Sequence, residues 1–405
     1  MNAKRPLQPD PAADAERTVA PSATDAACVV FAGGGTAGHI YPGVAIAETL
    51  VGERHPDLPP VRPHFVCSTR RLDAQVLGNL GLAYTTIPAE PVAGGLKGMI
   101  RFSRGWRPAV RAAQQVLREQ RAAAVVAMGG FVCAPVAAAA AKLRIPVLLI
   151  NLDAVAGKAN RLTARHATYR LTTAQGPKVP SEWTAIRPIV RAHAVAAQTP
   201  EQCRNHFNLY TDRPTLLVMG GSQGAASINN FMIHFATNLA QHLDRHHPEG
   251  RSAWQVLHIA GPNRSQPVRD AYRAAAICAT VLDYSEEMSL AWGAADLAIC
   301  RAGANTVAEA WANQTPCLFL PYPYHKDQHQ AANAKPLVRA GGSELFEDHV
   351  TPRKNAGSVG KRLLDLLCDP QPVVGMAANI RSMGATDGAS SAAQAVRNML
   401  AGNRP

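Results

Sequence analysis

Two glycine-rich segments, each directly behind an apolar run, are the residues of this chain best suited to bind a substrate. Gly33–His39 follows the run Cys28–Ala32, and Gly220–Ala225 follows Thr215–Met219 in the second half of the chain. A buried strand that breaks into glycines and then opens a helix presents backbone N–H groups to a phosphate. One such segment indicates a nucleotide-binding fold. Two at this separation predict two Rossmann-like domains that face each other across a cleft.

The first segment also matches the dinucleotide pattern G-x-G-x-x-G at Gly33, Gly35 and Gly38. A dehydrogenase needs an acidic residue at the end of its second strand to hold the ribose hydroxyls. The residues expected there, Cys67–Arg71, include no acidic side chain. NAD is therefore disfavoured, although the two arginines leave an NADP-dependent oxidoreductase as an alternative.

His39 lies just past these glycines, where a helix is expected to begin. A single histidine is usually structural or simply exposed to solvent. In a cleft beside a phosphate-binding turn, the same side chain is well placed to act as a general base. His39 is thus a candidate catalytic residue.

The segment Cys300–Glu309 runs from a strand end into a helix expected over Thr306–Ala312. Asn305 or Thr306 is expected to cap this helix, whose first amides would face an anion. Glu309 then lies one turn inside. It is either a surface glutamate stabilised by the helix dipole or a carboxylate that accepts both hydroxyls of a ribose.

The polar loop Pro321–Gln330 follows another strand and contains two histidines and an aspartate. Their spacing does not match that of tetrahedral metal ligands, and Asp and Gln side chains are equally well suited to bind sugar hydroxyls. The chain also contains no Asp-x-Asp sequence. We expect no metal or other cofactor. Helix N-termini and basic side chains would then have to neutralise a leaving diphosphate.

Residues 96–107 mix large apolar and cationic side chains. They are either a loop and helix start packed on the first domain, or a patch that enters an anionic membrane surface. The side chains that would form this patch are Leu96, Lys97, Met99, Ile100, Arg101, Phe102, Arg104 and Trp106.

The composition indicates a two-domain globular protein. The chain has 405 residues, of which 47% are hydrophobic and 17% charged, so each domain can bury its own core. A formal net charge of +12 favours phosphates, anionic lipid or nucleic acid as partners. Nucleic acid ranks last, because no basic run is interleaved with aromatics. The 8 cysteines are widely spaced, which indicates free thiols in a reduced compartment.

An uncharged stretch from residue 122 to residue 141 is long enough to span a bilayer, which takes about 20 residues. It is mostly alanine and is interrupted by Gly129-Gly130 and Pro135. A strand over Ala123–Met128 and a helix over Pro135–Leu143 explain it better than a membrane span. Residues 1–25 lack an apolar core and are expected to form a disordered tail.

Strand and helix signals alternate in both halves, which predicts an α/β fold with two doubly wound sheets. In the first half a helix is expected over Arg111–Glu119. In the second half Cys317–Leu320 is expected to be the last strand. Prolines accumulate between 176 and 211, the expected interdomain region. We expect domains at 26–190 and 191–380, and a C-terminal helical segment at 381–405 that packs on either domain. Two facing domains of this kind are typical of nucleotide-sugar glycosyltransferases of the GT-B type.

The ordered set of motifs resembles the MurG family of bacterial glycosyltransferases, over nearly the whole chain from about Ala27. The motifs are GGTAGHIYPG at 34–43, GGFVCAP at 129–135, GGSQGAASIN at 220–229, CRAGANTVAE at 300–309 and HKDQHQ at 325–330. The resemblance implies transfer of N-acetylglucosamine from UDP-N-acetylglucosamine (UDP-GlcNAc) to undecaprenyl-pyrophosphoryl-N-acetylmuramyl-pentapeptide (lipid I). It also implies an inverting, metal-independent reaction at the cytoplasmic face of the inner membrane.

The resemblance implies a role for each matched position. Thr36, Ala37 and Gly38 would line the acceptor side with His39 as base, and Phe131 would contact substrate nearby. On the donor side the resemblance implies these residues: Ser222, Gln223 and Gly224 for the diphosphate and nucleoside; Tyr284, Ser285 and Met288 beside the uracil; Ala304, Asn305, Thr306 and Glu309 around the diphosphate and ribose; and His329 and Gln330 on the sugar hydroxyls.

Three positions depart from the family. Ala37 replaces a glycine. The family's His-Glu-Gln-Asn is here Ile150–Asp153, so Asp153 replaces an asparagine and would either repel a diphosphate or share the base role. Arg191 matches a phosphate-contacting arginine only within an altered motif. The alternatives are a transferase of the same fold with another lipid or small-molecule acceptor, and a non-catalytic nucleotide-sugar binder.

Overall fold

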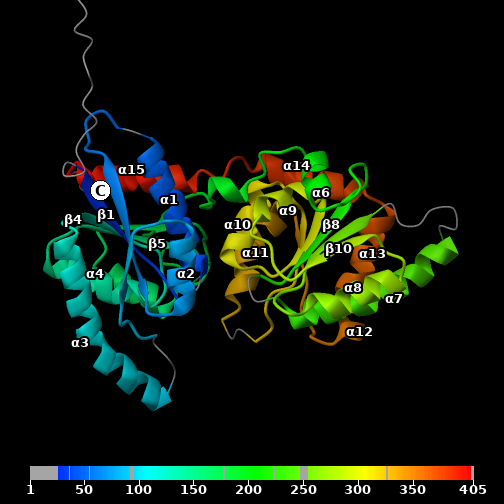
Figure 1. Ribbon diagram of the computed structural model, residues 1–405, viewed down its shortest axis with the longest axis horizontal. Coiled ribbons are helices and arrows are strands. Elements are labelled where there is room, and N and C mark those ends of the chain that lie inside the picture. The colour runs from blue at the N-terminus through cyan, green and yellow to red at the C-terminus, as the bar shows by residue number, and fades with distance from the viewer. Residues whose placement is uncertain are drawn as a thin grey trace, which may run out of the picture.

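Two parallel sheets, one in each half of the chain, form two lobes joined side by side (Figure 1). This computed structural model describes residues 26–35, 37–53, 55–91, 95–176, 178–221, 224–246, 254–324 and 327–402. The tail expected at 1–25 lies outside these ranges, as do Thr36, Ser222 and Gln223. The side chains of Ala37, Leu96, Lys97 and Met99 also lie outside the description.

The first lobe has a seven-stranded sheet in the order β3-β2-β1-β4-β5-β6-β7. Its strands are β1 (Ala27–Ala32), β2 (Val61–Ser68), β3 (Tyr84–Ile87), β4 (Ala122–Ala127), β5 (Val147–Asn151), β6 (Tyr169–Thr172) and β7 (Thr184–Ala185). Every neighbouring pair is parallel. The central strands are near-continuous apolar runs because helices cover both faces of the sheet. These helices are α1 (Tyr41–Gly52), α2 (Arg71–Asn79), α3 (Gly95–Glu119), α4 (Cys133–Lys142) and α5 (Lys158–Ala164).

The second lobe repeats this design with a six-stranded parallel sheet in the order β10-β9-β8-β11-β12-β13. Its strands are β8 (Thr215–Met219), β9 (Gln255–Ile259), β10 (Ala279–Leu282), β11 (Leu297–Cys300), β12 (Cys317–Phe319) and β13 (Glu344–Leu345). Its helices are α6 (Pro200–His206), α7 (Ala226–His246), α8 (Ser265–Ala274), α9 (Met288–Ala294), α10 (Ala304–Ala312), α11 (His329–Arg339), α12 (Pro352–Asn355), α13 (Lys361–Cys368) and α14 (Gln371–Ser382). Short helical turns lie at η1 (Ala37–His39), η2 (Ala192–Ala194) and η3 (Ala356–Gly360).

The last helix, α15 (Gly388–Leu400), returns from the second lobe to the first and lies against α1 (Figure 1). Its buried face includes Ala392, Val396 and Met399, which join the core beneath α1. Arg397 donates to the Glu53 carbonyl at the end of α1, over 3.0 Å. The chain therefore crosses between the lobes twice, and each crossing ties the two lobes together.

The sequence predicted most strands but misplaced several ends. The uncharged stretch is strand β4 followed by α4, as predicted, and no described helix is long and apolar enough to cross a membrane. The helix expected from Arg111 begins at Gly95 instead, because it continues through Pro108. Cys317–Leu320 is not the last strand, since the two-residue β13 pairs with β12. So short a strand leaves no detectable periodicity.

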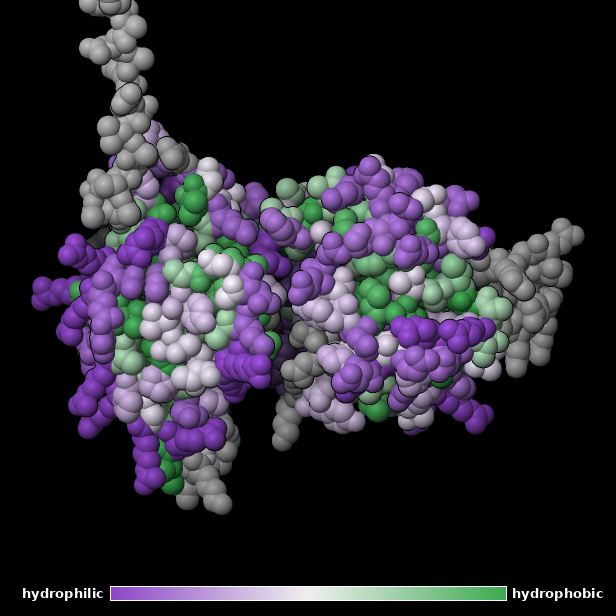
Figure 2. Space-filling view, viewed as in Figure 1, coloured by the Kyte–Doolittle hydropathy of each residue, from purple (hydrophilic) through white to green (hydrophobic). Residues whose placement is uncertain are grey.

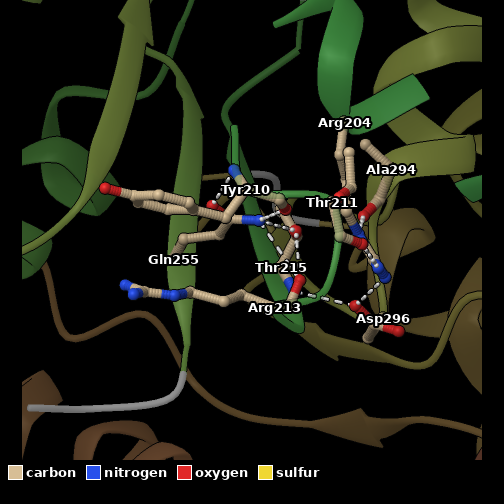
Figure 3. A network of polar contacts seen from close by, with 8 residues as sticks. All are labelled: Arg204, Tyr210, Thr211, Arg213, Thr215, Gln255, Ala294 and Asp296. Carbon is tan, nitrogen blue, oxygen red and sulfur yellow. Dashed lines mark hydrogen bonds and ion pairs between the residues drawn. The ribbon is translucent and has the colours of Figure 1, made fainter. Parts of the chain in front are cut away.

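A buried polar network fixes the entry into β8 (Figure 3). Arg204 donates to the carbonyls of Ala294 and Thr211, at 3.2 and 2.8 Å, and to Asp296 at 2.8 Å. Asp296 also accepts from the Thr215 amide at 2.7 Å. One guanidinium thus holds α6, the end of α9 and the first residue of β8 in register.

We expect Arg204→Met to lower the local stability of β8 by roughly 2–4 kcal/mol, because it leaves buried acceptors without donors. Hydrogen exchange of the β8 amides would measure this loss. The control is Arg213→Met, which removes a guanidinium stacked 4.0 Å above the Tyr210 ring and should change little. Equal protection of β8 in both variants would contradict the assignment.

Candidate active site

The first glycine loop leaves β1 at the carboxyl edge of the sheet, next to the second lobe. Gly35 has a positive φ of 90°, and a Cβ there would lie 2.6 Å from the Phe131 ring, so only glycine fits. Arg70 lies over the same ring, 4.9 Å from its centroid, and donates to the Gly35 carbonyl at 3.1 Å. Phe131, a predicted site residue, thus packs directly against the loop.

Asp73, in the first turn of α2, holds this loop from beneath. Its buried Oδ2 accepts from the Gly35 amide at 2.8 Å and from the Ser68 hydroxyl at 2.5 Å. Its Oδ1 is buried and has no hydrogen-bond partner. The acidic residue sought at the end of β2 is therefore one helical turn later and binds protein groups. An acidic residue in a first helical turn was a visible signal, but it did not reveal that this carboxylate reaches back to Gly35.

His39 lies in η1 against the glycine pair that follows β4. A Cβ on Gly130 would be 3.2 Å from its Nδ1, and one on Gly129 would be 3.1 Å from its Cδ2. Burial lowers the pKa of His39 below the ordinary value of 6.5. The charges of Asp153 and Asp73, and a hydrogen bond to the Gly34 backbone, oppose that shift. The ring is therefore a neutral potential base at neutral pH.

The altered segment after β5 forms a chain of side-chain amides. Asn151 is fully buried and donates to the Thr172 hydroxyl at 3.0 Å and to the Asp153 carbonyl at 2.7 Å. The Asn160 side chain donates to the side-chain oxygen Oδ1 of Asn151 at 2.9 Å. The Asp153 carboxylate accepts from Asn333 of the second lobe at 2.9 Å. The added carboxylate is therefore paired with an amide.

In the second lobe, the second glycine loop leaves β8 and enters α7. Gly224 has a φ of 69°, and a Cβ there would lie 2.4 Å from the Ala260 carbonyl oxygen. Glycine is therefore required here as it is at Gly35. The backbone is consequently free to approach a ligand closely in both lobes.

Helix α10 begins at Ala304, with Gly303 as its N-cap residue and no side-chain cap. The prediction that Asn305 or Thr306 caps the helix was wrong, because Gly303 already has the extended backbone of a cap residue. Asn305 lies within the first turn and donates across the cleft to the Gly38 carbonyl at a long 3.4 Å. Both residues still lie beside the helix N-terminus, next to Ala304.

Glu309 is not a solvated surface glutamate. Its Oε2 accepts from the Trp292 indole at 3.0 Å, which leaves Oε1 available to a ligand. Burial raises the pKa of Glu309, while the Trp292 hydrogen bond and the charge of Arg191 lower it. The role of Trp292 was invisible in the sequence, because an indole in an apolar helix indicates only a core residue.

Arg191, in the connection between the lobes, stacks on Tyr41 at the start of α1. The Arg191 guanidinium lies 4.0 Å above the Tyr41 ring centroid. Burial raises the pKa of Tyr41, and the charges of Tyr284 and Glu309 add to the shift, whereas Arg191 opposes it. Arg191, Tyr284 and Glu309 thus all lie near enough to Tyr41 to interact with it electrostatically. Tyr284 is 55% exposed. Two other predicted residues lie close by in sequence. The Ser285 hydroxyl accepts from the Glu287 amide, and Met288 packs against a hydrophobic core of the second lobe.

The loop after β12 arranges its polar residues internally. Gln330 accepts from the Tyr322 amide at 2.8 Å, and His329 Nδ1 lies 2.7 Å from Asp327. Within the described part of the chain, no group of three or more His, Cys, Asp or Glu side chains is placed to hold a metal.

Arg301, inside one of the sequence motifs, is buried in a polar network. It donates to the Leu320 carbonyl and to Asp348, both at 2.7 Å, and to the Ser227 hydroxyl at 2.8 Å. This buried network joins the loops after β11 and β12 to the start of α7. Arg301 therefore positions these loops and is not available to bind phosphate itself.

The furrow between the lobes is visible in the space-filling view (Figure 2). His39, Asp153 and Gly38 approach it from the first lobe, and Asn305 and Asn333 approach it from the second. The arrangement can hold an anionic ligand against two helix N-termini and present a base opposite to it.

Comparison with known families covers both lobes. A model of the glycosyltransferase family 28 N-terminal domain matches residues 29–172, and one of the C-terminal domain matches 215–391. A protein of Leifsonia xyli subsp. xyli is 33% identical over 381 residues, which cover 92% of this chain and 98% of the relative. One of Mycobacterium tuberculosis is 35% identical over 396 residues, covering 94% and 91%. Both are named UDP-N-acetylglucosamine--N-acetylmuramyl-(pentapeptide) pyrophosphoryl-undecaprenol N-acetylglucosamine transferase.

Solved structures share the two-lobed fold. MurG of Acinetobacter baumannii matches with a TM-score of 0.69 at 24% identity, covering 92% of this chain and 99% of that chain. The UDP-GlcNAc 2-epimerase of Neisseria meningitidis matches with a TM-score of 0.62 at 14% identity, covering 93% and 100%. These structures establish the GT-B fold. Because one of them is an epimerase, the fold alone does not identify a reaction.

We expect Asp73→Asn to lower the pKa of His39 further, because it removes a negative charge that stabilises the imidazolium. Titration of the His39 ring by NMR would measure the shift. The control is Asp283→Asn, which removes another carboxylate that accepts backbone amides, those of Arg264 and Ser265. A pKa that stays constant or rises in Asp73→Asn would show that this carboxylate does not act on His39.

Proposed function

This chain belongs to glycosyltransferase family 28, and we propose that it transfers N-acetylglucosamine from UDP-GlcNAc to the muramyl C4 hydroxyl of lipid I. The observation that carries the proposal is the contact across the cleft between the loop of His39 and the helix of Glu309, where Asn305 of α10 donates to the Gly38 carbonyl at 3.4 Å. Relatives with the corresponding names align over more than nine-tenths of this chain, which supports the same assignment. Residues 26–190 would hold the acceptor, and 191–380 the donor.

The donor side supports binding of a uridine diphosphate. The free Oε1 of Glu309 is placed to accept a ribose hydroxyl, because the Trp292 indole already fixes the other oxygen. Tyr284, Ser285 and Met288 would border the uracil, and His329 and Gln330 would contact the sugar hydroxyls. The backbone at Gly224 and the first turns of α7 and α10 would face the diphosphate. Arg191, held above Tyr41, would supply a nearby positive charge.

The reaction would be a single displacement that inverts C1 of the sugar. His39 accepts the proton of the acceptor hydroxyl as that oxygen bonds to C1, and the bond from C1 to the UDP oxygen breaks. The electron pair leaves with UDP towards the amides of α7 and α10, which stabilise the developing charge. Asp153 would stabilise the imidazolium, as its effect on the pKa of His39 indicates. We propose no metal for this step.

Release of UDP from UDP-GlcNAc, with and without a lipid I analogue, tests the proposal directly. We expect release to depend on the acceptor and to persist in EDTA. Asp153→Asn should retain donor binding, and Glu309→Gln should raise the KM for UDP-GlcNAc by about 10- to 100-fold. Donor binding without acceptor-dependent release would refute lipid I as acceptor, and a product screen with other acceptors would then identify the related transferase.

The start of α3 supports peripheral attachment to the cytoplasmic face of the inner membrane. The helix projects below the first lobe (Figure 1). Ile100 is 42% exposed, and Arg101 and Arg104 are also exposed. Phe102 and Trp106 stack with ring centroids 5.5 Å apart, and Trp106 packs partly on the first core. This segment therefore combines an exposed cationic end with an anchor to the lobe.

We expect the double variant Arg101→Glu/Arg104→Glu to reduce binding to anionic vesicles by at least about 10-fold, since each cation near the surface contributes about 1 kcal/mol. Co-sedimentation with phosphatidylglycerol vesicles would measure it. The matched control, Arg111→Glu/Arg118→Glu, makes the same charge change nearer the other end of α3. It should bind the vesicles more tightly than the Arg101→Glu/Arg104→Glu variant. Equal loss in both variants would indicate an effect of net charge alone.

A further inference from the structure

Asn333 belongs to α11 of the second lobe, but both polar atoms of its side chain contact the first lobe. Its Oδ1 accepts from the Ala154 amide at 2.8 Å, and its Nδ2 donates to the Asp153 carboxylate at 2.9 Å. The residue is only 4% exposed. One carboxamide therefore binds two consecutive residues across the cleft, and its Nδ2 also lies 3.4 Å from the Ala302 carbonyl of its own lobe.

Asp153 is held by contacts from both lobes. Its backbone carbonyl accepts from Asn151 of its own lobe at 2.7 Å, while its carboxylate accepts from Asn333. The backbone of Asp153 is thus part of the rigid first lobe, whereas the direction of its carboxylate depends on the second lobe. The titratable groups that act on the His39 ring are Asp153 and Asp73, both of the first lobe, so the second lobe contributes a neutral amide.

Helix α11 carries another polar contact one turn earlier. Gln330 lies three residues before Asn333, so the two side chains lie on one face of the helix. The Gln330 side chain accepts from the Tyr322 amide at 2.8 Å and so ties the helix start to the loop after β12. The helix proposed to contact the donor sugar is therefore the same helix that holds the carboxylate beside the proposed base.

We propose that Asn333 is a positioning residue that makes activation of the acceptor hydroxyl depend on closure of the two lobes. This inference rests on the proposed transferase function. When α11 approaches the first lobe, the Asn333 amide directs the Asp153 carboxylate towards His39. When the lobes separate, the carboxylate loses that partner, and the base is not set for proton transfer. Proton removal is thereby confined to the closed state that holds both substrates, which limits hydrolysis of the donor.

The test compares two carboxylates at positions 153 and 333 with one amide opposite one carboxylate. Asn333→Asp places two carboxylates face to face, so we expect kcat for transfer to fall about 100-fold while the KM for UDP-GlcNAc changes little. The double variant Asp153→Asn/Asn333→Asp restores an amide opposite a carboxylate, and the carboxylate introduced at position 333 can still accept from the Ala154 amide. We expect the contact between the lobes to form again but kcat to stay low, because position 153 then carries no carboxylate beside His39. Asn379→Asp, an exposed change on α14, is the matched control.

A merely structural role for Asn333 predicts a different result, because kcat would then recover in the double variant together with the contact. Recovery of kcat in the double variant would overturn the inference. Hydrogen exchange of the Ala154 amide gives a second measure without turnover, and Asn333→Ala should accelerate it. If wild type shows no acceptor-dependent UDP release, the proposed function fails, whereas unchanged Ala154 exchange in Asn333→Ala refutes the contact itself.

Discussion

Both halves of the site depend on one steric constraint: the backbone must turn where no Cβ fits. Gly35 meets the Phe131 ring, and Gly224 meets the Ala260 carbonyl, and each has a positive φ. Parallel strands bring such turns to the carboxyl edge of each sheet, where helix N-termini also gather. Such turns offer backbone amides to a ligand, and these amides cannot be removed by side-chain mutation. The surrounding side chains are consequently free to position the loops and to contact the ligand.

Those side chains act mainly by holding other protein groups. Asp73 binds the Gly35 amide, and Arg301 binds Asp348 and the Ser227 hydroxyl, so neither is directed at a substrate. Asp73 and Arg301 are thus each paired with groups of the loops that form the site. Leaving such a group unpaired costs several kcal/mol, so the loops are held in one arrangement. Preorganisation of this kind is what electrostatic catalysis requires.

The sequence allowed the two sheets, the glycine loops and the uncharged stretch to be predicted, because each is encoded by residues adjacent in the chain. The Asn305 or Thr306 cap was mispredicted, since the helix start depends on the backbone at Gly303. The partners of Glu309 and Asp73 could not be predicted either. Trp292 and Gly35 reach them only through tertiary packing, and hydrophobic periodicity contains no information about such contacts.

The departure at Asp153 shows how a charge can be added to such a site. A carboxylate near a diphosphate costs Coulomb energy unless a donor or a cation offsets it. Here Asn333 supplies the donor from the opposite lobe, and His39 becomes the cation once it accepts a proton. The carboxylate therefore opposes the donor's charge least when His39 is protonated, which is the state that the proposed transfer reaches. The substitution thus favours the reacting complex over the resting one, provided that the lobes are closed around it.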